Sequence, residues 1–267
     1  MKNVLKISLT FYLVFTLFGC EDYLNPVPET QLDSNLAFET KERIVGQVNG
    51  LYAFMKVGAY RGGRFFVYND IRADNFIPKS TNLVTGFATW NHSLLGSRDE
   101  VQNLWGAIYA TINAVNIFLE GLESNWDDGN LEGKITEAEY NQFQSEALTL
   151  RAICYFDLLQ LYAQPYNKDN GASPGMPLRL TANIIGGNND LARSTVAQTY
   201  ALILQDLNDA EPLAIATYSN ALLRTTRIHK NTIIAFKTRV YQHMNNWGAV
   251  KTEAAKIVSA TAPFVSP

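Results

Sequence analysis

The amino-acid sequence predicts an all-α fold, made of helical hairpins that are joined by long irregular loops. Apolar residues recur at steps of three and four over several stretches, which is the period of an amphipathic helix. Capping residues and prolines mark where these stretches begin and end. Some connections are so short that the helices they join must lie antiparallel, as in a tetratricopeptide hairpin. No regular repeat period runs through the chain, so we predict a helical-repeat-like architecture and nothing more regular.

The longest helical pattern runs over residues 145–165, and we predict that it forms the central helix. Neighbouring aromatic residues widen its apolar stripe until most of the circumference is apolar, so other helices should cover it on more than one side. Thr136 and Glu139 have the spacing of a capping box ahead of the stretch, and Pro165 ends it. The stripe itself consists of Ala147, Leu150, Cys154, Leu158 and Leu161.

Two charged residues, Glu146 and Arg151, lie inside this apolar stretch. A buried charge is costly unless it is compensated. We therefore predict that both residues are structural anchors, paired with neighbouring helices or with loop backbone.

Other helical patterns lie on either side of the central one. We predict helices over residues 35–56, 99–122, 194–212 and 230–244, with a short turn at 247–248 leading into a last helix over 249–259. Ser34 or Asn35 is available to cap the first helix, and Ser194 or Thr195 is available to cap the 194–212 helix, where Thr195 with Gln198 has the capping-box spacing. Pro212 is expected to end the helix that Thr195 begins. A turn-rich break over 124–130 should separate the second helix from the central one.

The N-terminal residues 1–19 have the form of an export signal, with Lys2 and Lys6 followed by a short apolar run. The Gly19-Cys20 pair at its end resembles the bacterial lipobox, which implies cleavage before Cys20 and attachment of a diacylglyceryl group to its sulfur. The alternative is a plain secretory signal with a chance cysteine. Residues 20–34 show no periodicity and are predicted to form a tether.

Composition and motifs exclude several classes of function. The chain of 267 residues has a net charge of −3 and no basic cluster, so we predict no nucleic-acid partner. Its two cysteines, Cys20 and Cys154, give no sign of a disulfide framework. The histidines lack metal-ligand spacing, and no nucleophile elbow, phosphate loop or dinucleotide fingerprint is present in the sequence. We therefore predict no metal, no cofactor and no enzymatic activity.

Residues 58–98 break the helical pattern and mix aromatic rings with amides and charges. Rings stack on the C–H face of a sugar, while Asn, Asp and Arg bond to its hydroxyls. The alternative is that Trp90 belongs to the core and that the polar residues cap loop backbone. Residue types of this kind are Tyr60, Arg61, Arg72, Asp74, Asn75, Trp90, Asn91 and His92. Of these, we predict as glycan-binding residues Arg72, Asp74, Asn75, Trp90 and Asn91.

An ordered series of short motifs resembles the SusD/RagB family of nutrient-binding outer-membrane lipoproteins of Bacteroidetes. It starts at Cys20-Glu21-Asp22-Tyr23-Leu24 and Asn49-Gly50-Leu51-Tyr52, and continues with Trp105, Tyr109, Ile112 and Asn116. It proceeds through Glu146-Ala147, Leu150-Arg151-Ala152, Tyr155-Phe156-Asp157-Leu158 and Gly175-Met176-Pro177-Leu178. It ends with Asp206-Leu207, Ala210, Leu213 and Arg239-Val240-Tyr241 before Trp247.

This resemblance implies tetratricopeptide-like hairpins and a domain over residues 35–267 that is incomplete at its C-terminus. It also implies a surface-exposed protein, anchored by lipid in the outer membrane, that binds a glycan or another nutrient oligomer. The ligand would pass to a partner TonB-dependent transporter of the SusC kind, without any chemistry on the ligand. The alternative function is a lipid-anchored helical-repeat scaffold that binds a protein partner and no sugar.

Overall fold

The computed structural model describes residues 36–73, 75–77, 79, 81, 86–183 and 190–258. In these residues the regular structure is helical, apart from one isolated antiparallel bridge between Pro174 and Thr195. The predicted all-α fold is therefore confirmed. The predicted signal peptide and tether, residues 1–34 with Cys20, lie outside the described residues. The account below concerns the compact unit that starts at Phe38.

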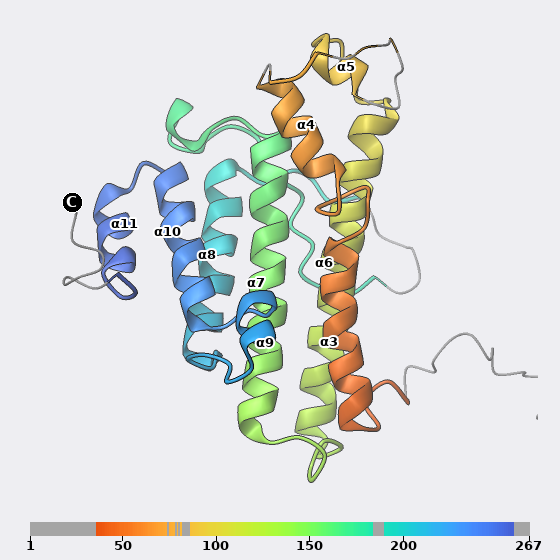
Figure 1. Cartoon of the computed structure of the whole chain (residues 1–267), viewed down its shortest axis with the longest axis vertical. Coiled ribbons are helices and arrows are strands. Elements are labelled where there is room, and N and C mark those ends of the chain that lie inside the picture. The colour runs from red at the N-terminus through yellow and green to blue at the C-terminus, as the bar shows by residue number, and fades with distance from the viewer. Residues whose placement is uncertain are drawn as a thin grey trace, which may run out of the picture. The chain divides into compact units, whose positions relative to one another are not determined.

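Figure 1 shows the order of the elements along the chain. They are α3 (Lys41–Met55), α4 (Arg64–Arg72), α5 (Phe87–Trp90), α6 (Asp99–Asp127), α7 (Glu137–Tyr162), the 3-10 helix η3 (Tyr166–Lys168), α8 (Val196–Leu213), α9 (Ala221–Thr226), α10 (Lys230–His243) and α11 (Trp247–Ala254).

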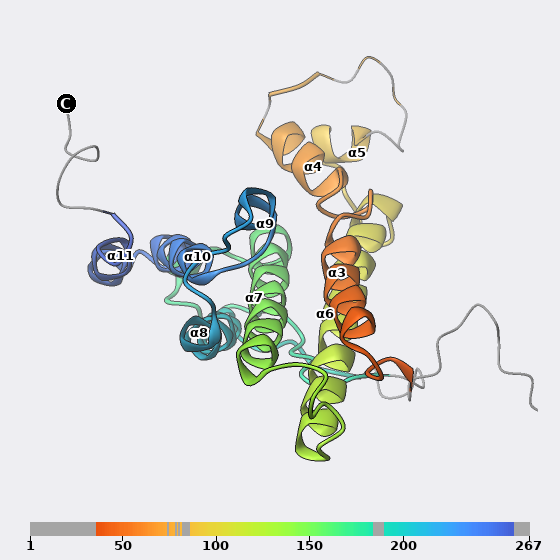
Figure 2. The same cartoon turned by 60° about the horizontal axis from the view of Figure 1, so that its bottom comes forward.

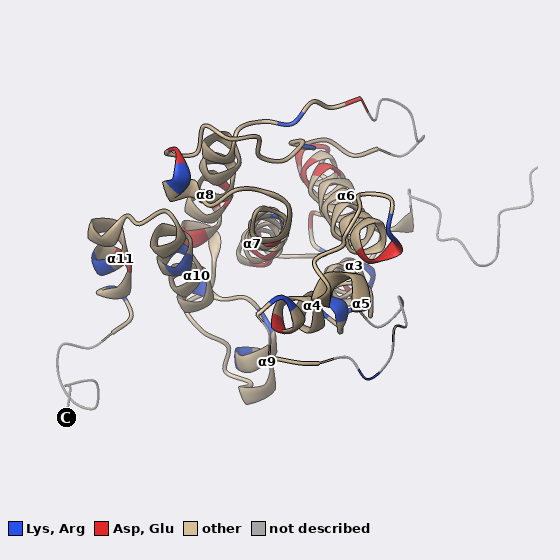
Figure 3. Ribbon diagram, turned by 90° about the horizontal axis from the view of Figure 1, so that it is seen from above, with Lys and Arg blue, Asp and Glu red and all other residues tan. Residues whose placement is uncertain are grey.

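Helix α7 is the central helix, as predicted. Seen end-on in Figure 3, it lies between α8 and α10 on one side and α3 and α6 on the other. The capping box of Thr136 and Glu139 is present at its start. The helix ends at Tyr162, with Ala163 already extended, and so stops short of Pro165. This fits the steric restriction that a proline places on the residue before it.

The antiparallel partner of α7 in the chain is α6, which is longer than predicted. The helix continues through the expected break at Ser124 and ends at Asp127. Trp126 stacks on Tyr140 of α7, with ring centroids 4.3 Å apart. This contact across the hairpin favours another turn of helix although the local sequence favours a turn.

Helix α3 begins later than predicted. Its N-cap is Thr40, whose Oγ1 accepts a hydrogen bond from the backbone N–H of Arg43 at 3.3 Å. Ser34 and Asn35, the predicted caps, lie outside the described residues. Just before this cap, Phe38 is buried and stacks on Phe118 of α6 at 6.1 Å. The chain is therefore fixed to α6 before the helix starts. The inner face of α3 consists of Ile44, Val48, Leu51 and Met55, which are buried.

The last helices form a second group around α8. The capping box of Thr195 and Gln198 is present, and α8 runs one residue beyond Pro212, to Leu213, where the sequence predicts a stop at the proline. Helix α10 packs against both α8 and α11, and it lies alongside α11 in Figure 2. Helix α11 begins at Trp247 and ends at Ala254, earlier at both ends than predicted.

The region 58–98 is not wholly irregular, which corrects the prediction. It contains α4, which buries Tyr68 and Ile71, and the short helix α5. The two helices contact each other. At Gly86 the chain has φ of 88°, and an added Cβ would lie 2.7 Å from Cδ1 of Ile71. Only glycine fits this close approach in a left-handed conformation, so Gly86 allows α5 to pack on α4.

Candidate functional site

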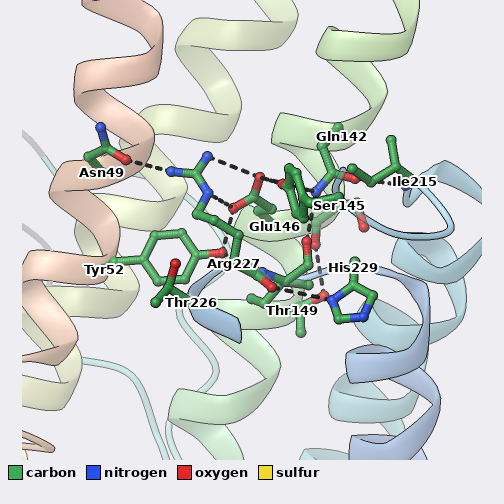
Figure 4. A network of polar contacts seen from close by, with 12 residues as sticks. Asn49, Tyr52, Gln142, Ser145, Glu146, Thr149, Ile215, Thr226, Arg227 and His229 are labelled. Carbon is green, nitrogen blue, oxygen red and sulfur yellow. Dashed lines mark hydrogen bonds and ion pairs between the residues drawn. The ribbon is translucent and has the colours of Figure 1, made fainter. Parts of the chain in front are cut away.

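The largest cluster of polar contacts surrounds Glu146, whose side chain is fully buried on α7 (Figure 4). Its carboxylate accepts hydrogen bonds from the hydroxyls of Tyr52 and Tyr218 and from Nε2 of Gln142, and it forms an ion pair with Arg227 at 2.8 Å. These partners come from α3, from α7 itself and from the segments on either side of α9. The cluster joins elements that are distant in sequence, and its centre has no access to solvent.

The second buried cluster surrounds Arg151 of α7. Its guanidinium donates two parallel hydrogen bonds to Asp206 of α8, at 2.9 and 2.8 Å, and a third to Oδ1 of Asn116 of α6 at 2.9 Å. Asn116 in turn donates to the backbone carbonyls of Arg179 and Thr181. The predicted pairing of Glu146 and Arg151 with neighbouring helices and segments is therefore confirmed.

The third buried cluster changes the interpretation of two residues whose types suit sugar binding. Tyr60 is fully buried, and its hydroxyl donates to Asp157 at 2.6 Å. Arg61 donates twice to the same carboxylate, at 2.7 and 2.9 Å. Both side chains therefore fasten the loop after α3 to α7. Beside them, burial raises the pKa of the Cys154 thiol to about 12, so this cysteine stays neutral and packs as an apolar residue.

The residues predicted to bind glycan lie on or next to the pair of helices α4 and α5. Arg72 is the last residue of α4, is exposed, and donates from Nη2 to the carbonyl of Leu161 at 3.2 Å. Trp90 is the last residue of α5 and is half-buried, with its ring 5.8 Å from that of Phe87. Asn75 and Asn91 are exposed. Asp74 lies outside the described residues.

The burial of Trp90 bears on the choice between a core and a surface position. On the short helix α5, Ala88 and Thr89 point inward and are buried. Trp90 and Phe87 are both only half-buried, while the following Asn91 and His92 are exposed. The indole is therefore partly accessible, which an aromatic platform for a sugar requires.

A hollow of about 110 Å³ lies beneath this surface, and we call it the Glu100 hollow. Figure 1 shows that α4, α5, the first turn of α6 and the last turn of α7 all meet at one end of the bundle. These four elements line the hollow. Its polar and aromatic lining residues are Tyr68, Arg72, Thr89, Glu100 and Tyr162.

Glu100 is the most unusual residue of this hollow. Its side chain is only 5 % exposed, and one of its oxygens, Oε2, accepts hydrogen bonds from the backbone N–H and the hydroxyl of Thr89. Among the described residues, its other oxygen, Oε1, has no hydrogen-bond partner. Sequence reasoning missed this residue, because an acidic side chain in the first turn of a helix is ordinarily explained by the helix dipole.

A second hollow, of about 330 Å³, lies further along α6. Its lining includes Trp105, Tyr109, Pro177, Arg179 and Leu191. The rings of Trp105 and Tyr109 lie 4.8 Å apart, and the hydroxyl of Tyr109 donates to the carbonyl of Pro177 at 2.8 Å. Trp105 also meets Tyr162, a lining residue of the Glu100 hollow, edge-on at 5.0 Å. Trp105 itself is half-buried.

The described part of the chain has accessible aromatic and polar side chains on the α4–α5 surface. In the residues that the structure describes, no three His, Cys, Asp or Glu side chains gather to hold a metal ion. Over the same residues, none of the helices combines the length and apolar character that crossing a bilayer requires. The groups that the α4–α5 surface and its hollow offer are aromatic faces, amides, a guanidinium and a carboxylate oxygen, which suit hydroxylated ligands.

Comparisons with known proteins agree with this fold. A SusD-like family model, described as "Starch-binding associating with outer membrane", matches residues 22–242. The SusD-like protein P38 of Formosa agariphila is 25 % identical over 97 % of this chain. A SusD superfamily structure from Bacteroides fragilis has a TM-score of 0.74 at 33 % identity over 85 % of the chain, and covers 51 % of that protein. Another, from Bacteroides thetaiotaomicron, has a TM-score of 0.71 at 25 % identity; it covers 83 % of this chain and 46 % of that one.

The chain spans about half the length of the curated relatives it matches, for example 47 % of P38. The family model nevertheless covers most of the chain, and the helical fold agrees with that of the solved relatives. The sequence and the structure thus lead to the same conclusion: this chain belongs to the SusD/RagB family.

Proposed function

We propose that this protein is a surface-exposed lipoprotein of the outer membrane, which binds a glycan and delivers it to a partner TonB-dependent transporter of the SusC kind. The observation that carries the glycan-binding part is the α4–α5 surface, which has a half-buried Trp90 at the end of α5 and an exposed Arg72 at the end of α4, with Asn75 and Asn91 also exposed. The description of the family as starch-binding and associated with the outer membrane supports both the ligand class and the location.

The lipid anchor and the transporter rest on the resemblance in sequence. The signal pattern that ends at Gly19-Cys20 supports lipidation at Cys20. More than one acyl chain on this cysteine would give stable anchoring, which a single chain does not. Partnership with a transporter follows the resemblance to the family, in which a protein of this kind covers a transporter barrel.

A second candidate function is a lipid-anchored scaffold that binds a protein partner and no sugar. A specific observation favours it: α4 exposes Phe66 and Val67, whose side chains are 51 % and 48 % accessible. Adjacent exposed apolar side chains of this size are typical of protein contacts. The two candidate functions predict different effects of substitutions on α4 and α5. Glycan binding predicts that Trp90→Ala weakens the affinity for a glycan, and the scaffold function predicts that Phe66→Ser weakens the contact with a partner protein.

The test of glycan binding uses the full chain and a panel of polysaccharides that includes starch and laminarin. Trp90→Ala should weaken the binding of the recognised glycan by about tenfold, because the ring no longer stacks on the sugar. Affinity gels identify the glycan, and calorimetry then measures the dissociation constant.

The matched control is Trp247→Ala, which removes another partly accessible tryptophan, 60 % exposed at the start of α11. Equal effects of both substitutions would contradict a site on α5. The scaffold function would be favoured if the chain binds no glycan and co-purifies with a partner protein, and if Phe66→Ser abolishes this co-purification.

A further inference from the structure

The Glu100 hollow contains a feature that the fold itself does not explain. Buried carboxylates are ordinarily paired or bonded at both oxygens, since an unsatisfied buried charge costs several kcal/mol. The other buried acidic residues are paired with a cation, and this includes Glu253, whose Oε2 has no hydrogen bond among the described residues but forms an ion pair with Lys256 at 2.8 Å. Glu146, Asp157 and Asp206 each have a guanidinium within 2.9 Å. Glu100 has hydroxyl and amide donors from Thr89 on one oxygen and, within the described residues, no bonding partner on the other.

Both tyrosine hydroxyls around this hollow are engaged, and Arg72 uses only part of its donor capacity. The hydroxyl of Tyr162 donates to the carbonyl of Val101 at 2.9 Å, and the hydroxyl of Tyr68 accepts from Arg64 at 3.1 Å. Arg72, on the α4 wall, donates from one nitrogen to the carbonyl of Leu161. Burial raises the pKa of Tyr68, and the Glu100 carboxylate adds to this shift, while Arg64 opposes it. Glu100 thus lines the hollow and keeps one buried oxygen without a hydrogen bond, which a ligand in the hollow can satisfy once the carboxylate turns toward it.

The size and chemistry of the hollow restrict that ligand. A volume of about 110 Å³ holds several water molecules, or one edge of a sugar ring, and is well below that of a pocket for a whole drug-sized ligand. The carboxylate oxygen of Glu100 accepts hydrogen bonds and repels anions, whereas the guanidinium of Arg72 donates hydrogen bonds. A sugar hydroxyl can donate a hydrogen bond to the carboxylate and accept one from the guanidinium. The sulfate or carboxylate group of an anionic sugar can only accept hydrogen bonds, so such a group is disfavoured next to Glu100.

We propose that Glu100 is a ligand-binding residue, which accepts a hydrogen bond at Oε1 from one of two adjacent hydroxyls of a neutral sugar while Arg72 bonds to the other. This inference rests on the proposed glycan binding. It adds a specificity residue to the α4–α5 surface: the hollow selects an uncharged sugar edge over an anionic one. Trp90 stacks on the glycan at the surface, and Glu100 recognises its hydroxyls below.

The test compares Glu100→Gln with the wild-type full chain. Glutamine keeps the shape of the side chain and an acceptor for Thr89, but it removes the charge and one of the two acceptor oxygens. The affinity for the neutral glycan identified on the polysaccharide panel should fall by at least about tenfold, as expected for the loss of a hydrogen bond to a charged group. The preference for that glycan over polygalacturonate should shrink, because the repulsion of the uronate is gone.

The matched control is Asp99→Asn, because Asp99 is an exposed acid in the same first turn of α6. It removes the same charge from the same helix end without lining the hollow. A second variant, Leu94→Phe, narrows the hollow without altering Glu100 and should also weaken binding. Melting curves of all three variants show whether each one remains folded.

The outcomes separate the two proposals. A loss of affinity in Glu100→Gln and Leu94→Phe, with Asp99→Asn unchanged, supports a binding role for Glu100. Unchanged affinity in Glu100→Gln, or an equal loss in Asp99→Asn, overturns that role and leaves glycan binding intact. Wild-type preference for polygalacturonate overturns the neutral-sugar specificity. A wild-type chain that binds no glycan overturns both proposals.

Discussion

The charged side chains inside α7 each meet an opposite charge on a different element. Glu146 pairs with Arg227, Arg151 with Asp206, and Asp157 with Arg61. Such pairs contribute little net stability relative to apolar residues, because the loss of hydration offsets their attraction. They are nevertheless sensitive to the loss of one partner, since the other charge then stays buried alone. At the residue scale, these pairs fix which elements lie next to α7.

We expect Arg151→Ala to lower the melting temperature strongly and to leave ligand preference unchanged. The substitution leaves the carboxylate of Asp206, whose side chain is 3 % exposed, buried without its cationic partner. It should therefore lower the free energy of unfolding by about 3 to 5 kcal/mol. Urea denaturation and a thermal melt measure the loss. The control is Lys41→Ala, whose pair with Glu139 is largely exposed and should cost less than about 1 kcal/mol. Equal melting curves for Arg151→Ala and the wild type would contradict the anchor role.

At the element scale, local signals decide where helices begin. Both capping boxes that the sequence predicts are formed, at Thr136 for α7 and at Thr195 for α8. These signals are reliable because the cap and its partner lie only three residues apart, so no tertiary contact is needed to bring them together. The end of α6 and the start of α3 depend on contacts with other helices, and there the predictions were wrong.

We expect Thr136→Ala to destabilise the protein by about 1 kcal/mol, because the backbone N–H of Glu139 loses its acceptor at the start of the central helix. Thr136→Ser keeps a hydroxyl at the same position and serves as the control. Urea unfolding of the two variants should show a lower midpoint for alanine alone. A serine variant as unstable as the alanine variant would point to the lost methyl group instead of the cap.

At the scale of the whole molecule, one end of the bundle gathers the features proposed for function. Helices α4 and α5 with the ends of α6 and α7 form the surface of Trp90 and the Glu100 hollow. The proposed anchor, Cys20, comes before the compact unit that starts at Phe38. The anchor and the binding surface thus belong to different parts of the chain and can be tested separately.

We expect Cys20→Ser to remove the lipid, and with it the association with the membrane, while the glycan affinity of the protein stays the same. Fractionation of cells and the mass of the intact mature protein measure the two effects. Cys154→Ala is the control, since that thiol is buried in α7 and should not change the location of the protein. A Cys20→Ser protein that stays in the membrane fraction with an unchanged mass would exclude lipidation at this residue.

The sequence by itself determined the helical fold, the central position of α7, its charged anchors and the family. Periodicity and caps are local, and a charge inside an apolar helix requires a partner wherever that partner lies. The tertiary structure alone decided which residues become accessible. Tyr60 and Arg61 offer an aromatic ring and a guanidinium, as Trp90 and Arg72 do, yet they bond to Asp157 in the interior. Glu100 is a candidate ligand-binding residue only because α4, α5 and α7 pack around it and form a hollow. Its burial and its oxygen without a hydrogen bond arise from packing between distant segments, which the local sequence does not show.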